Sequence, residues 1–136
     1  MPSFSAMCLK RGRGDCGVQA TLFITMCRAA GVPARWQSGW ETKRAGNSMH
    51  DWAEFYCAPW GWLPADQSYG VQKSDDPKVR DFYLGHQDSY RTIINVDYGR
   101  ELVPPKKSLR SEPADFQVGR LRSTGGICST KSGIMT

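Results

Sequence analysis

The stretch GDCGVQATLFITMCRAAGVP, residues 14–33, decides the fold. Small or apolar side chains recur in it at steps of four and three residues, which places them on one face of a helix; they are Cys16, Ala20, Phe23, Cys27 and Ala30. Asp15 stands where a side chain caps a helix start, and Gly31 and Pro33 stand where a helix ends. The stretch therefore predicts one buried helix over residues 16–30, and Leu22 and Met26 widen its apolar face.

Short segments rich in aromatic residues follow this helix and predict strands. We expect strands at 34–41 and 50–57 with a polar loop between them, a third at 62–66, a fourth at 91–97 and a weaker one at 115–121. Pro64 cannot donate to a ladder, so the third strand is expected at a sheet edge. The fold class is therefore α+β, with the helix packed on an antiparallel sheet. We expect one domain over residues 1–122 and a flexible tail over 123–136.

Composition and charge exclude several classes of protein. The 136 residues carry a net charge of +5, but the basic residues are spread along the chain, which disfavours nucleic acid as a partner. No apolar run approaches the roughly 20 residues that cross a bilayer, and the first residues lack the apolar stretch of a signal peptide. We therefore expect no membrane partner, and the compartment stays open. The five cysteines form no CxxC pair and no disulfide framework, so neither a zinc site nor a cofactor is expected.

Three residues combine into a candidate catalytic site. Cys16 opens the predicted helix, where the dipole and the unpaired amides favour a thiolate, and its own amide could donate to an oxyanion. His50 opens a strand directly after a loop and is the candidate proton acceptor. Asp66 ends the returning third strand and could orient the imidazole. This geometry is a hypothesis, because it requires the register of two strands to bring His50 and Asp66 together.

Each candidate also has a structural explanation. A cysteine in an apolar helix is most often a small buried hydrophobe, and we interpret Cys27 in that way. Asp66 could cap a turn. A metal site that joins Cys16 and His50 to Cys57 or His86 is disfavoured by the spacing. Four tryptophans are assigned either to the core or to the wall of a substrate groove; they are Trp36, Trp40, Trp60 and Trp62.

The segment GDCGVQATLFITMCRAAGVPARWQSGW, followed by HDWAEFYCAPWGWLPADQSYG, resembles the transglutaminase-like superfamily, whose fold is similar to that of papain. The resemblance covers about residues 8–70, and its four parts occur in order: the cysteine at a helix start, the R-A-A-G-V-P-A-R end, the H-D-W-A-E strand and the W-L-P-A-D strand. It implies that Cys16 is the nucleophile, His50 the base and Asp66 the orienting carboxylate.

The resemblance also implies a reaction. In such proteins the cysteine attacks an amide and forms a thioester, so we expect acyl transfer on a protein or peptide substrate, with hydrolysis by a peptidase or amidase preferred. Two alternatives remain open: a cross-linking transglutaminase, and an inert binding module of the same fold. Papain-like domains usually place further helices before the nucleophile, whereas 15 residues precede Cys16 here. We therefore expect the chain to be the C-terminal portion of a larger protein.

Overall fold

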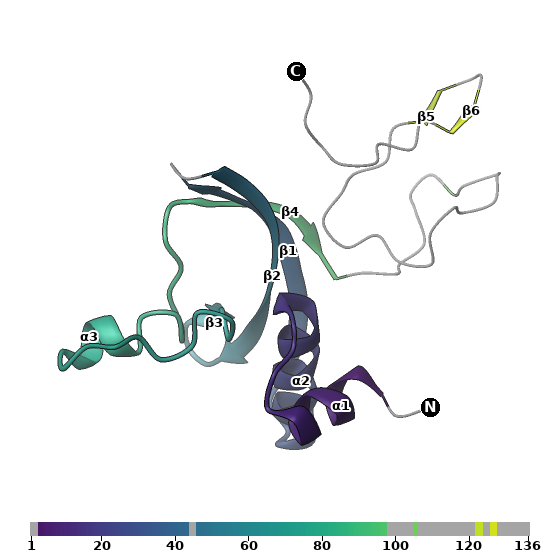
Figure 1. Ribbon diagram of the computed structural model, residues 1–136. Coiled ribbons are helices and arrows are strands. Elements are labelled where there is room, and N and C mark those ends of the chain that lie inside the picture. The colour runs from purple at the N-terminus through teal and green to yellow at the C-terminus, as the bar shows by residue number, and fades with distance from the viewer. Residues whose placement is uncertain (1–2, 44–45, 98–104, 106–121, 124–125, 128–136) are drawn as a thin grey trace.

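The computed structural model describes residues 3–43, 46–97, 105, 122–123 and 126–127. Within them the fold is α+β, as the sequence predicts, with helices near the N-terminus and a four-stranded antiparallel sheet (Figure 1). The elements are α1 Phe4–Arg11, α2 Cys16–Ala29, β1 Ala34–Lys43, β2 Gly46–Cys57, β3 Gly61–Ala65, α3 Pro77–Arg80, β4 Arg91–Val96, β5 Arg122–Ser123 and β6 Gly126–Ile127.

Helix α2 begins and ends close to the predicted positions. The Asp15 carboxylate accepts from the Val18 amide at 2.8 Å and caps the helix start, which leaves Cys16 as the first helical residue. At the other end Gly31 takes a φ of +79°, the left-handed conformation that stops a helix. Helix α1, which the sequence did not predict, packs beside α2 (Figure 1). None of the described helices is long and apolar enough to span a membrane.

The sheet has the strand order β3-β2-β1-β4, and every neighbouring pair is antiparallel. Strand β3, which contains Pro64, is an edge strand as predicted. The predicted polar loop between the first two strands is wrong for most of its length, because β1 continues to Lys43 and β2 starts at Gly46. Pairing between the strands extends the hairpin through residues that look like a loop in isolation.

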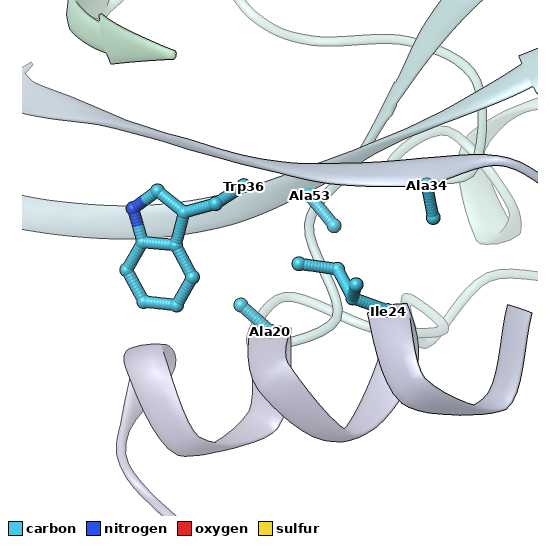
Figure 2. Packing of buried hydrophobic residues seen from close by; sticks show 5 residues of the cluster. All are labelled: Ala20, Ile24, Ala34, Trp36 and Ala53. Atoms are coloured by element: carbon cyan, nitrogen blue, oxygen red, sulfur yellow. The ribbon is translucent and has the colours of Figure 1, made fainter. Parts of the chain in front are cut away.

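The core lies between the sheet and α2. Figure 2 shows Trp36, Ala34 and Ala53 pointing from the strands toward Ala20 and Ile24 of the helix, with Trp36 nearest the helix start. The predicted buried face of the helix is correct for Ala20 and partly correct for Phe23 and Cys27. Two residues of the predicted face, Ala30 and Met26, are exposed, because the sheet covers the turn that carries Ile24 instead. This packing fixes the start of α2 against the middle of the sheet.

The region beyond Val96 is described only in part. Its described strands, β5 and β6, pair with each other as a two-residue ladder. The predicted strand at 115–121 lies outside the described residues. The domain boundary at 122 and the flexible tail stay predictions.

Candidate active site

Cys16 occupies the first position of α2, between the capping Asp15 and Gly17. Its amide belongs to the first turn of the helix, whose N–H groups have no carbonyl partner inside the helix. The side chain is half-buried, and the thiol is free. A partly accessible sulfur at a helix N-terminus has the surroundings in which thiolates form.

His50 and Asp66 meet as the sequence hypothesis requires. Strands β2 and β3 pair through Ala53 and Ala65, so Asp66, the next residue, continues alongside β2 toward His50. The distance from His50 Nε2 to Asp66 Oδ2 is 2.7 Å, and both side chains are buried. Because Nε2 is bound to the carboxylate, the second ring nitrogen, Nδ1, is the one left for exchange of a proton with sulfur.

The Asp66 carboxylate is bound on both of its oxygens. Oδ1 accepts from the backbone amides of Ser68 and Tyr69, at 3.1 and 3.4 Å. Oδ2 accepts from His50 and also from Arg91 of β4, at 2.9 Å. With 2% of its surface exposed, Asp66 is shielded from solvent, and these donors replace its hydration. The carboxylate is therefore fixed in orientation and kept available to the imidazole.

The electrostatics of His50 follow from these contacts. Burial of the imidazole lowers the pKa of His50, but hydrogen bonds to Asp66 and Cys16, together with the charges of both partners, outweigh burial and raise the pKa to about 9 from 6.5. The ring is also enclosed by aromatic side chains, with centroids 5.9 Å from Trp52 and 5.8 Å from Tyr69. The imidazole is therefore held as an imidazolium at neutral pH, close to the sulfur.

A second carboxylate lies at the sulfur. Asp51 Oδ2 is 3.5 Å from Cys16 Sγ, and the residue is buried, with 5% of its surface exposed. The contact is possible because residue 17 is glycine: a methyl group on Gly17 would lie 3.0 Å from Asp51 Oδ2 and 3.1 Å from the Trp36 ring. Asp51 was not among the site residues predicted from the sequence. The available signal was its place two residues before Ala53, on the strand face that α2 covers.

The four tryptophans differ in their exposure to solvent. Trp36 is a core residue, with 2% exposed, so its assignment to a substrate groove is wrong; the residue lies under the start of α2 and supports it. Trp40, Trp60 and Trp62 are exposed. Trp62 lies under the guanidinium of Arg35, 4.2 Å from the ring centroid. The groove role of the three exposed tryptophans stays a prediction.

The described part of the chain contains free thiols and no candidate metal site. Cys8, Cys16, Cys27 and Cys57 are free thiols. Burial raises the pKa of the Cys27 thiol, in keeping with its interpretation as a small hydrophobe. In this part of the chain, no group of three or more His, Cys, Asp or Glu side chains is arranged to hold a metal ion.

Comparison with known proteins finds a family similarity for the segment that carries the candidate site. The model of the transglutaminase-like superfamily matches residues 5–67, which run from α1 through α2 and the β2–β3 pair to the residue after Asp66. This segment is similar to the transglutaminase-like superfamily, which is one of cysteine-based acyl-transfer and protease-like proteins. No curated protein and no solved structure matches the chain.

Proposed function

We propose that this protein is a cysteine-dependent acyl-transfer enzyme that hydrolyses amide bonds in a protein or peptide. The observation that carries the proposal is the buried bond between His50 and Asp66 beside Cys16. A nucleophile, a base in contact with it and a carboxylate that orients the base are the three parts that thioester chemistry needs. The similarity of residues 5–67 to the transglutaminase-like superfamily supports the same chemistry.

The reaction follows from the positions of the three groups. With its proton held by the His50 imidazolium, Cys16 Sγ attacks the carbonyl carbon of the substrate amide. The developing oxyanion is stabilised by the Cys16 amide at the start of α2. As the carbon–nitrogen bond breaks, the imidazolium returns the proton to the leaving amine. Water then attacks the thioester, His50 accepts its proton, and the carboxylic acid and the free thiol are released.

A specific observation favours one alternative, the inert binding module. Asp51 places a negative charge 3.5 Å from the sulfur, and like charges at that distance disfavour a thiolate. Against it, His50 also interacts with Cys16, and a positive charge beside a cysteine favours its reactive form. The rate at which the Cys16 thiol reacts therefore shows whether Asp51 or His50 has the larger effect on it.

Alkylation with iodoacetamide separates these two readings. Cys16, Cys27 and Cys57 are all half-buried, so differences between their rates report reactivity rather than access alone. We expect Cys16 to be labelled at least about tenfold faster than the other two at pH 7, since it is the thiol beside an imidazolium. His50→Ala should remove this preference, and Cys16→Ser should remove the fast phase. Equal, slow labelling of all three thiols would favour the inert module.

Product analysis separates hydrolysis from cross-linking. Casein and a fluorescent primary amine are incubated with the protein, and with Cys16→Ser as the control. Release of peptides or of free carboxylate supports hydrolysis. Incorporation of the amine into casein would instead assign the protein to the cross-linking class. Neither product, together with slow alkylation, would contradict acyl transfer.

A further inference from the structure

A buried arginine is bound to the carboxylate of the candidate site. Arg91 opens β4, and only 1% of its side chain is exposed. Its guanidinium donates to Asp66 Oδ2 at 2.9 Å and to Glu41 of β1, and it lies 3.6 Å from Asp88. An arginine without solvent is costly unless carboxylates surround it, as they do here.

Aromatic rings complete the surroundings of this guanidinium. Its central carbon lies 4.7 Å from the centroid of Tyr69, 5.9 Å from Trp52 and 6.0 Å from Tyr83. Tyr69 also donates to Glu41, and Tyr83 donates to Asp88 at 2.9 Å. The guanidinium is thus surrounded by carboxylates and aromatic rings, and two of these rings, Tyr69 and Tyr83, are fixed by hydrogen bonds of their own. Its position relative to Asp66 is set by packing and does not depend on a mobile surface side chain.

The geometry gives Arg91 a specific effect on the base. His50 and Arg91 bind the same oxygen of Asp66, at 2.7 and 2.9 Å. Their donor nitrogens are therefore within about 6 Å of each other, a distance at which one charge shifts the protonation of another by one to three pKa units. A single carboxylate oxygen shared by two cations binds each less strongly than it would bind one alone.

We propose that Arg91 is a positioning residue of the site: its guanidinium fixes the Asp66 carboxylate and takes up part of its charge, so that His50 can release a proton to the leaving group. The inference rests on the proposed function. It adds a residue of β4, outside the segment that matches the family. A base that kept its proton too firmly would form a thiolate readily but would protonate the amine poorly.

The test is an NMR titration of His50, which needs no catalysis. The chain has two histidines, so His86→Gln assigns the signals. In Arg91→Met, the pKa of His50 should rise above the wild-type value of about 9 by about one unit or more, because a neighbouring positive charge is lost. In Glu41→Gln, the pKa should fall, because the guanidinium is no longer shared with Glu41 and acts more fully on Asp66.

The charges that face this pair from the packed elements define the controls. The titratable groups that face His50 are Cys16, Asp66 and Tyr69. Those that face Arg91 are Glu41, Asp66, Asp88, Tyr69 and Tyr83. Arg35→Met is the matched control: it removes an arginine that is also paired with a glutamate and stacked on a tryptophan, but Arg35 aligns with Glu54, four residues along β2 from His50. We expect it to leave the His50 titration unchanged.

Each outcome decides the inference. Opposite shifts in Arg91→Met and Glu41→Gln support it. An unchanged or lowered pKa of His50 in a folded Arg91→Met variant would overturn it. If that variant does not fold, Glu41→Gln and Asp88→Asn decide, and an unchanged or raised pKa in both overturns it. Fast alkylation of wild-type Cys16 supports the proposed function in either case, so the two failures are distinguishable.

Discussion

The raised pKa of His50 predicts that the stability of this protein depends on pH near neutrality. The folded state binds the imidazole proton more tightly than the unfolded chain, with a pKa of about 9 against 6.5. The contribution of this proton to stability is therefore complete below about pH 6.5 and is lost as the pH rises through about 9. At 1.36 kcal/mol per unit, the loss amounts to about 3 kcal/mol, which is a large share of the stability of a small domain.

Urea unfolding at several pH values measures this loss. The free energy of unfolding is determined from pH 6 to pH 9.5 for the wild type and for His50→Gln. We expect the wild type to lose stability at up to about 1.4 kcal/mol per pH unit between these limits, and the variant to lose much less. The difference between the two curves removes the contribution of Cys27, whose raised pKa also costs stability above its usual range. Tyr83, with a pKa raised to about 12 by burial and by its bond to Asp88, stays protonated throughout.

Two further variants sharpen the interpretation. Asp66→Asn keeps the shape of the carboxylate but removes its charge, so its curve should resemble that of His50→Gln. His86→Gln is the matched control, because His86 is exposed and stacks on Phe82 at the surface. Parallel curves for the wild type and His50→Gln would refute the reasoning, since they would show that the imidazole gains nothing from Asp66 and Cys16 on folding.

Three other substitutions, and Trp60→Ala as a control, test the packing around the sulfur and the sheet. Asp51→Asn should speed alkylation of Cys16 at pH 7 about fivefold or more, because a charge 3.5 Å from the thiolate costs about 1 kcal/mol even in water; a slower rate would contradict this. Gly39→Ala would place a methyl group 1.8 Å from the Thr92 carbonyl oxygen, so unfolding in urea should show a loss above about 2 kcal/mol, as overpacking predicts. Trp36→Ala should cost about 3 to 5 kcal/mol, whereas exposed Trp60→Ala should cost less than about 0.5, and similar losses would contradict the core assignment.

The elements that carry the candidate triad could be predicted because their signals are local. Asp15 caps the helix through a bond to a residue three positions away, and Gly31 ends it through its own backbone angle. The turn between the second and third strands is short, so it allows Asp66 only a few positions relative to His50. Capping and hydrophobic period therefore predicted α2 and the strands β1 to β4 that follow it, whereas the meeting of His50 and Asp66 was a hypothesis that depended on strand register.

The missed features depend on contacts between distant parts of the chain. Strand β1 pairs with β4, and this brings Arg91 to Glu41, fifty positions away. Nothing in RTIINVD distinguishes its arginine from a solvated one. The extended hairpin was missed for a related reason, since Glu41 aligns with Ser48 only once the register is known. The choice between core and groove stayed open for Trp36, because the sequence around this tryptophan carries no local signal for burial.

The segment that matches the family model does not contain all the groups that bind the Asp66 carboxylate. Residues 5–67 contain the thiol, the imidazole and the carboxylate, but a carboxylate with 2% exposure and several donors is stable only when those donors are present. Two of these donors, the Ser68 and Tyr69 amides, follow the segment directly. Among the described residues, the only charged donor to Asp66 other than His50 is Arg91 on β4. The proposed effect of Arg91 on the base would therefore come from the edge strand β4, which joins the sheet on the side opposite β3. The candidate triad and the arginine that we propose to adjust its charge lie in different parts of the chain.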